Sequence, residues 1–295
     1  MVKLIAIDMD GTLLNTSHEV SKRNVDAING ALEQGVYVTI ATGRAYQEAL
    51  DAIKGESLEL PLICLNGAEM RNKKHEITVQ QNLEDEQIKL ISEILQSEDM
   101  YYQVYTDQKI YILDKERELQ IYIDIAEKMG QKPEVEKIRQ KIQKRIDKGT
   151  LVEVDNYKEI YKKENEKVMK ILATSHNSAK LDRVKNELSK SEDLAVSSSS
   201  QNNIEITNVK AQKGVAIKAI ADELNIDLAD CMAIGDNLND VSMLKVVGTS
   251  VAMENSPTVV SALADYITVS NEEDGVALAI ESALNEDFSK LQYND

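Results

Sequence analysis

Apolar runs and amphipathic segments alternate along the first part of the chain. Short apolar runs occur at residues 3–7, 36–41 and 60–65. Apolar side chains at helical spacing occur at residues 25–32 and 46–53. This order predicts strand, helix, strand, helix and strand, joined by short turns. Such an alternation is typical of a parallel sheet built from right-handed βαβ units.

The pattern changes at about residue 83 and returns after Lys213. Between these points we predict helices at 88–95, 119–129, 138–146 and 181–188, strands at 101–105, 109–113, 168–173 and 204–207, and a polar turn at 197–203. After Lys213 we predict helices at 217–224 and 276–284, strands at 231–234, 250–253 and 266–269, and a short helix between the first two of these strands. The predicted fold class is α/β: a doubly wound, Rossmann-like parallel-sheet core, residues 1–82 and 209–295, with an inserted α+β domain, residues 83–208.

Composition narrows the class of protein and its partners. The chain has 295 residues and a formal net charge of −17, which disfavours nucleic acid and acidic membranes as partners. Cys64 and Cys231 lie in apolar runs, so we predict reduced, buried thiols and a cytoplasmic location. The N-terminal apolar run is shorter than a signal-peptide core, and no uncharged apolar run of about 18 residues follows. We therefore expect neither secretion nor a membrane span, and a monomer or dimer fits the charge.

Polar residues with possible catalytic chemistry follow several of the predicted strands. Asp8 and Asp10 follow the first strand; the other segments are Thr42-Gly43-Arg44, Asn66-Gly67, Lys213-Gly214 at a helix start, and Gly235-Asp236-Asn237-Leu238-Asn239-Asp240. Because the carboxyl ends of parallel strands share one edge of a sheet, we expect these residues to converge. The oxygen ligands of Asp8, Asp10 and Asp236 suit Mg²⁺, whereas the three histidines have no zinc-like spacing.

Each of these segments, taken alone, also fits an ordinary structural role. Paired aspartates and a GDxxND string are common in turns and helix caps, and Thr-Gly is common in turns. An isolated lysine is usually a surface residue. Their joint occurrence, each at a strand end or a helix start, favours a catalytic site.

The same segments resemble the motifs of a known enzyme group. In order along the chain they are DMDGTLL at 8–14, ATGR at 41–44, Lys213-Gly214 and GDNLNDVSML at 235–244. They resemble the four motifs of the haloacid dehalogenase superfamily, most closely its Cof-type phosphatases with a type IIB cap, and VAMENS at 251–256 and EDGVALAI at 273–280 also fit. Gln212 and Glu254 depart from the residues that relatives often carry. The resemblance covers nearly the whole chain and implies that residues 83–208 are a cap domain that selects the substrate.

The resemblance also implies roles for individual residues. It makes Asp8 the nucleophile that becomes an aspartyl phosphate, and Asp10 the general acid and base. It implies that Mg²⁺ is held by Asp8, the backbone carbonyl of Asp10 and Asp236, with Asp240 orienting them. The implied phosphate-binding groups are Thr42, Lys213, Asn239 and the amides of Met9 and Gly43, and possible further substrate contacts are Arg44, Asn66 and Gly67.

The function implied is a Mg²⁺-dependent phosphomonoesterase that hydrolyses small phosphorylated metabolites. Sugar phosphates are the first substrate class expected, followed by flavin and pyridoxal phosphates. Two alternatives stay open: a phosphomutase of the same superfamily, and a non-catalytic protein that binds phosphometabolites. A signalling receiver domain is excluded by layout, because receivers are much shorter and carry the acceptor aspartate on a later strand.

Overall fold

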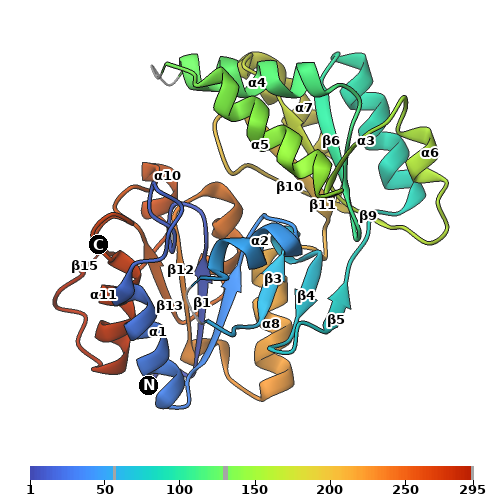
Figure 1. Cartoon of the computed structure of the whole chain (residues 1–295). Helices are drawn as coiled ribbons and strands as arrows, with labels where there is room; N and C mark the ends of the chain where they lie inside the picture. Colours follow the sequence, from blue (N-terminus) through green and yellow to red (C-terminus); the bar gives the residue numbers. More distant parts are fainter. Residues whose placement is uncertain (56–57, 129–131, 294–295) are drawn as a thin grey trace. The chain divides into compact units, whose positions relative to one another are not determined.

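The protein divides into two compact units. The computed structural model describes residues 1–55, 58–128 and 132–293 (Figure 1). Met1–Gln80 and Lys210–Asp295 form one unit, here called the core unit, and Gln81–Val209 form the other, here called the inserted unit.

A nine-stranded sheet runs through the core unit in the order β15-β14-β13-β12-β1-β2-β3-β4-β5. The strands are β1 Leu4–Asp8, β2 Tyr37–Ala41, β3 Leu62–Cys64, β4 Glu69–Arg71, β5 Ile77–Gln80, β12 Cys231–Gly235, β13 Thr249–Ala252, β14 Tyr266–Ile267 and β15 Gln292–Tyr293. All pairs from β14 to β3 are parallel, and antiparallel pairs add β15 at one edge and β4 and β5 at the other. The chain winds outward from β1 in both directions, so the predicted doubly wound α/β core is confirmed.

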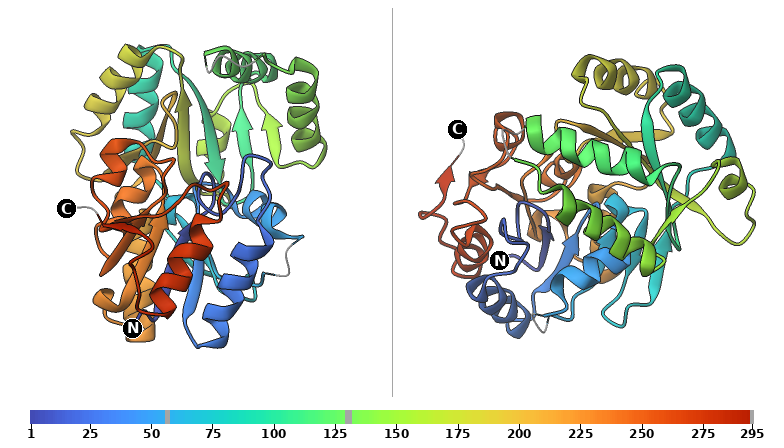
Figure 2. Two further views of the ribbon diagram at one scale, coloured as in Figure 1. Left: turned by 90° about the vertical axis from the view of Figure 1, so that its left-hand side faces the viewer. Right: turned by 45° about the horizontal axis from the view of Figure 1, so that its top comes forward.

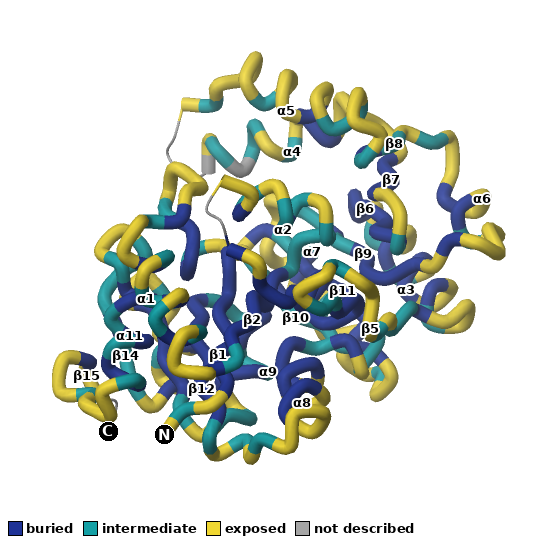
Figure 3. Tube along the Cα trace, turned by 60° about the horizontal axis from the view of Figure 1, so that its bottom comes forward, coloured by how far each residue is buried: buried dark blue, intermediate teal, exposed yellow. Residues whose placement is uncertain are grey.

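Helices cover both faces of this sheet (Figure 2). They are α1 Lys22–Glu33, α2 Tyr46–Ile53, α8 Lys213–Leu224, α9 Val241–Leu244, α10 Thr258–Ser261 and α11 Gly275–Leu284. Side chains alternate along β1: Ile5 and Ile7 join the apolar cluster of α1, α2 and α11, while Leu4 and Ala6 join that of α8 and α9. A strand buried on both faces reads as a continuous apolar run, and β1 and β12 are dark blue in Figure 3.

The inserted unit has its own six-stranded sheet, in the order β10-β11-β9-β6-β7-β8. Its strands are β6 Tyr101–Thr106, β7 Ile110–Ile112, β8 Leu151–Glu153, β9 Val168–Thr174, β10 Leu194–Ser197 and β11 Asn203–Asn208; its helices are α3 Asp85–Ser97, α4 Lys115–Lys128, α5 Val135–Asp147, α6 Lys158–Tyr161 and α7 Ser178–Leu188. Among the strand pairs that the structure describes in this unit, only β7–β8 is parallel. Ile91 of α3 and Val184 of α7 pack with Val104 and Ile171 of the sheet. The predicted α+β character is confirmed, and the strands predicted at 101–105 and 109–113 are present as the antiparallel pair β6–β7.

Several local predictions are wrong. The pattern missed β4, β5, β8, β10, β15, α6 and α10, which are all short. Strand β5 has only four residues, Ile77–Gln80, and is largely exposed, so its alternation of apolar and polar residues is too short to mark a strand. Ser197 and Asn203, predicted in a turn, belong to β10 and β11, and the strand predicted at 266–269 ends at Ile267. Met129, the last residue of one predicted helix, lies outside the described residues.

Two further predictions concern thiols and membranes. Cys64 and Cys231 are free and buried, as their apolar surroundings in the sequence predicted. Within the part of the chain that the structure describes, no helix is both long and apolar enough to cross a bilayer.

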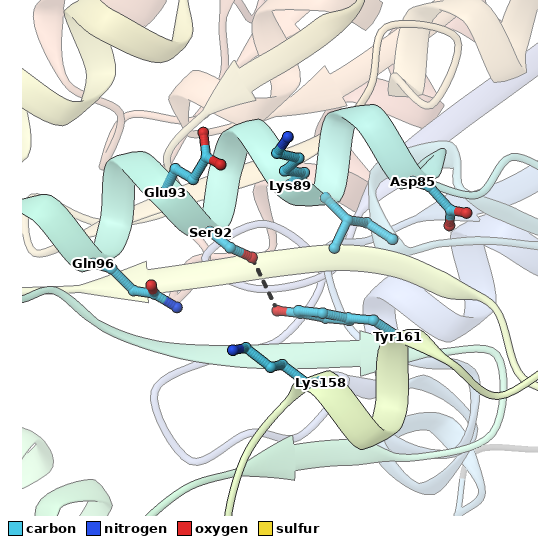
Figure 4. A pocket seen from close by; sticks show the side chains of 8 residues that line it. Asp85, Lys89, Ser92, Glu93, Gln96, Lys158 and Tyr161 are labelled. Carbon is cyan, nitrogen blue, oxygen red and sulfur yellow. Dashed lines mark hydrogen bonds between the residues drawn. The ribbon is translucent and has the colours of Figure 1, made fainter.

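The inserted unit carries a hollow of about 420 Å³ between α3 and α6 (Figure 4). Ile88 and the ring of Tyr161 line it, and the Ser92 hydroxyl donates a hydrogen bond of 3.3 Å to the Tyr161 hydroxyl. The other side chains around it are exposed ones: Asp85, Lys89, Glu93, Gln96 and Lys158. The hydroxyls of the buried Ser92 and the half-buried Tyr161 are therefore partners of each other.

Candidate active site

Parallel strands bring the predicted residues to one edge of the core sheet. Asp8 is the last residue of β1, Thr42 directly follows β2, and Asp236 directly follows β12. Asp8 pairs in register with Ala41, and Ile7 with Ile234, so the three strand ends stand at nearly the same height. The convergence expected from the topology is therefore present.

Lys213, the first residue of α8, lies at the centre of this edge. Its Nζ donates to Asp8 Oδ1 at 2.5 Å and to Asp240 Oδ1 at 2.6 Å, and the lysine is fully buried. Burial alone would lower the pKa of Lys213, but the charges of Asp240 and Asp8 outweigh it and raise that pKa above its usual value. The site thus holds a permanent ammonium charge between two carboxylates.

Asp240 ties the loop after β12 to this lysine. Its second carboxylate oxygen, Oδ2, accepts hydrogen bonds from the backbone amides of Asp236 and Asn237, each at 2.9 Å. Both oxygens of Asp240 are therefore already engaged, one by Lys213 and the other by the loop. Asp240 therefore links Lys213 to the loop after β12.

Asp8, Asp236 and Asp240 form a buried acidic cluster. Each offers a carboxylate oxygen, and these oxygens lie within 4.8 Å of one another. Burial, together with the charge of Asp240, raises the pKa of Asp236 to about 7 and that of Asp8 well above its usual value. Three carboxylates and one ammonium leave an excess of negative charge. This excess disfavours the ionised carboxylates, which is why the pKa values of Asp8 and Asp236 are raised.

A hard divalent cation fits this cluster. Carboxylate oxygens are the ligands that Mg²⁺ prefers, and its charge would relieve the repulsion between the buried carboxylates. Asp8 and Asp236 are the side chains best placed to hold it, because Asp240 is engaged elsewhere. The carboxylate of Asp10 is not part of the cluster, so any contribution from this residue would come from its backbone carbonyl.

Gly11 allows the chain to pass close to Asp236. Its φ is +81°, and a Cβ on it would lie 2.6 Å from Asp236 Oδ2. Thr12, which the sequence reasoning left out of the site, donates from Oγ to Asp236 Oδ1 at 2.9 Å. The signal that could have identified Thr12 is its place in DMDGTLL, directly after the two aspartates.

Asp10 has surroundings quite different from those of Asp8. Its side chain is 50% exposed, and its carboxylate accepts from Arg44 Nε at 2.8 Å and Nη2 at 2.5 Å. Met9, between the two aspartates, points its side chain into the apolar core. Asp8 therefore faces the buried cluster, whereas Asp10 is paired with an arginine near solvent.

A strained turn after β3 carries Asn66. Leu65, Asn66 and Gly67 all have positive φ, at 50°, 61° and 108°. The backbone amide of Asn66 donates to the backbone carbonyl of Thr42 at 2.9 Å. A Cβ on Gly67 would lie 2.7 Å from the Gln212 carbonyl oxygen. The turn therefore joins the segment after β2 to the residue preceding Lys213, and only glycine fits at its last position.

The same turn reaches the loop after β12. Asn239 Nδ2 donates to Asn66 Oδ1 at 3.3 Å, and both residues are buried. Thr42 is also buried, and its Oγ accepts from the Arg44 amide at 3.1 Å. These predicted residues thus form two contacting sets: Asp8 with Lys213, Asp236 and Asp240; and Asp10 with Arg44, Thr42, Asn66 and Asn239.

Comparison with known proteins identifies the family. The sequence profile described as haloacid dehalogenase-like hydrolase matches residues 5–280. The chain belongs to this family. Among curated relatives of this haloacid dehalogenase-like hydrolase, phosphatase YwpJ of Bacillus subtilis is 32% identical, over 94% of this chain and 98% of its own. The 5-amino-6-(5-phospho-D-ribitylamino)uracil phosphatase YwtE of Bacillus subtilis is also 32% identical, over 98% and 100%.

Solved structures agree with this assignment. A haloacid dehalogenase-like hydrolase from B. subtilis superposes with a TM-score of 0.85 at 32% identity, covering 95% of this chain and 99% of that one. These relatives match over nearly their full length, so the assignment applies to both units of the chain. This haloacid dehalogenase-like hydrolase is an enzyme that acts on phosphoric monoesters.

Proposed function

We propose that this hydrolase is a Mg²⁺-dependent phosphomonoesterase that works through an aspartyl phosphate on Asp8. The observation that carries the proposal is the placement of Asp8: it is buried at the end of β1, 2.5 Å from the ammonium of Lys213 and beside Asp236. A carboxylate is a competent nucleophile toward phosphorus when nearby positive charge offsets the repulsion between two anions.

The reaction has two steps. An oxygen of Asp8 attacks the phosphorus, the bond to the ester oxygen breaks, and Asp10 gives its proton to the leaving alcohol. Asp10 then takes a proton from water, whose oxygen attacks the phosphorus of the aspartyl phosphate, releasing inorganic phosphate and restoring Asp8. Mg²⁺, when bound, supplies positive charge that offsets repulsion between the carboxylate and the phosphoryl group.

Other residues hold the phosphoryl oxygens during both steps. A lysine ammonium has three donors, and Lys213 directs two of them to Asp8 and Asp240. Its third donor, with the Thr42 hydroxyl, the Asn239 amide and the backbone amides of Met9 and Gly43, would bind oxygens whose charge grows in the transition state. Asn66 and Asp240 would keep Asn239 and Lys213 in position.

The proposed substrates are small metabolites whose phosphate sits on a sugar or sugar-alcohol chain. Two relatives support this class: YwtE and YcsE of Bacillus subtilis, 32% and 30% identical, are named phosphatases of 5-amino-6-(5-phospho-D-ribitylamino)uracil. That compound carries its phosphate on a ribityl chain. We propose that the inserted unit acts as the cap that excludes water and selects the leaving group.

Phosphate release from a panel of esters tests the proposal. The panel contains sugar phosphates, 5-amino-6-(5-phospho-D-ribitylamino)uracil, flavin mononucleotide, pyridoxal phosphate and nucleotides, each with Mg²⁺ and with a chelator. We expect metal-dependent release, with the highest kcat/KM for a sugar or sugar-alcohol phosphate, and none from Asp8→Asn. Transfer between two hydroxyls of a sugar without phosphate release would instead identify a mutase, and metal-independent release would contradict the proposed site.

A further inference from the structure

Arg44 donates hydrogen bonds to both oxygens of the Asp10 carboxylate. Arg44 Nε donates to Oδ2 at 2.8 Å and Nη2 donates to Oδ1 at 2.5 Å, which is a two-point contact. Such a pair sets the plane of the carboxylate as well as attracting its charge. A lysine, with a single point charge, would attract the carboxylate without setting its plane.

Arg44 is itself anchored at both ends. Its backbone amide donates to Thr42 Oγ at 3.1 Å, and its Nη1 contacts the carbonyl oxygen of Glu48 in α2 at 3.5 Å. Its side chain is 24% exposed, against 50% for Asp10. The arginine is therefore the more firmly held partner, and it can restrain the aspartate.

Asp10 needs such a restraint. Its carboxylate lies outside the buried cluster, and Gly11, with a φ of +81°, follows it directly. A half-exposed aspartate has several side-chain rotamers within reach, and acid–base transfer requires the carboxylate within hydrogen-bond reach of the reacting oxygen. Two of the four lone-pair positions of the carboxylate are used by Arg44, which leaves positions for the proton that Asp10 donates to the leaving group and later accepts from water.

We propose that Arg44 is a positioning residue that orients Asp10 for the acid–base steps, and that it is not primarily a substrate-binding residue. The inference rests on the proposed function, because it takes Asp10 as the acid and base. Three of the five guanidinium donors already point at Asp10 and Glu48, so few are left for a substrate.

A double-mutant cycle tests this role. We expect Arg44→Gln to lower kcat by about 10²-fold, the size of a small misplacement of a catalytic group, and to change KM by less than about threefold. Introduced into Asp10→Asn, Arg44→Gln should cause no further loss of kcat, because the residue it positions no longer transfers protons. A rise in KM, or losses that multiply in the double variant, would show direct substrate binding and overturn the proposal.

Two further variants separate positioning from charge and from general stability. Arg23 makes the same kind of two-point contact with Glu281, at 3.3 and 2.9 Å, in the same unit, so Arg23→Gln should leave kcat unchanged. Arg44→Lys keeps the positive charge but cannot make the two-point contact, and we expect its kcat to stay near that of Arg44→Gln. Wild-type kcat in Arg44→Lys would show that charge alone suffices, and would refute positioning.

The failure of this inference can be told apart from failure of the proposed function. If Asp8→Asn or Asp10→Asn keeps wild-type turnover, the proposed mechanism is wrong whatever Arg44 does. If both lose turnover while Arg44→Gln behaves like the control Arg23→Gln, the mechanism stands and only the positioning role fails.

The dependence of the rate on the leaving group gives a second readout. The departure of 4-nitrophenolate needs little help from an acid, whereas the departure of an alkyl alcohol needs more. The rate at which the substrate phosphorylates Asp8 should therefore fall further in Arg44→Gln with an alkyl phosphate than with 4-nitrophenyl phosphate. An equal loss for both would count against the proposal.

Discussion

The buried acidic cluster makes the stability of the metal-free protein depend on pH. Burial and the neighbouring charge of Asp240 raise the pKa of Asp236 to about 7, whereas an ordinary aspartate has a pKa of 3.8. Between these two values the folded protein binds more protons than the unfolded chain. The contribution of Asp236 to the free energy of unfolding should therefore be highest below about pH 4 and should fall as the pH rises towards 7.

The size of the effect follows from the difference between the two pKa values. A difference of about three units, at 1.36 kcal/mol per unit, corresponds to about 4 kcal/mol for Asp236. Asp8 adds to it in the same direction, because burial raises its pKa as well. Mg²⁺ should oppose the loss, since it binds the deprotonated carboxylates and its stabilisation therefore grows with pH.

Urea unfolding followed by circular dichroism between pH 4.5 and 7.5 measures this dependence. In a chelator, the wild type should lose stability with rising pH more steeply than Asp236→Asn, which cannot titrate at this position. Asp26→Asn is the matched control, because Asp26 is exposed on α1 and pairs with Lys22 at the surface. Its profile should follow that of the wild type.

Two results would refute this reasoning. If the free energy of unfolding in chelator changes with pH in the same way in the wild type and in Asp236→Asn, Asp236 titrates as an ordinary aspartate. A stabilisation by Mg²⁺ that is equal at pH 5 and pH 7.5 would mean that the cation does not bind these deprotonated carboxylates. The first result would contradict the electrostatics of the cluster, and the second its role as a metal site.

Three further predictions concern single residues. Asp8→Asn should lose phosphate release while keeping the far-ultraviolet circular dichroism of the wild type; substantial turnover would exclude Asp8 as the nucleophile. Lys213→Met leaves Asp8 and Asp240 without their buried partner and should lower the free energy of unfolding by about 3–5 kcal/mol in urea titrations, as well as abolish turnover. Gly67→Ala should destabilise by about 1–3 kcal/mol, because its φ is 108° and the new Cβ would meet the Gln212 backbone, whereas Gly30→Ala, with open space around it, should be neutral or stabilising; equal effects of the two substitutions would contradict this steric argument.

Much of the core unit could be predicted from local patterns. Strands β1, β2, β3 and β12 are buried on both faces, so they appear in the sequence as apolar runs that need no knowledge of their partners. The short strands β4, β5 and β15 gave no such signal. They exist because a neighbouring strand offers hydrogen bonds at the sheet edge, and that neighbour is known only once the chain has folded.

The residues of the candidate site were equally accessible to sequence reasoning, but their pairings were not. Asp8, Asp10 and Asp236 follow apolar runs, and position at a strand end is a local property. That Arg44 holds Asp10, and that Asn66 holds Asn239, depends on the path of the backbone between strands. Thr12 was missed for the same reason, since its partner Asp236 is 224 residues away.

The sequence by itself determined the order of elements in the core unit and the chemistry available at the ends of its strands, because periodicity and strand-end position are encoded by neighbouring residues. The tertiary structure alone decided which charges meet. Lys213 reaches Asp8 across 205 residues, and their burial together with Asp240 sets the charge balance of the site. Distance and desolvation control the strength of electrostatic interactions, and both are properties of the folded chain.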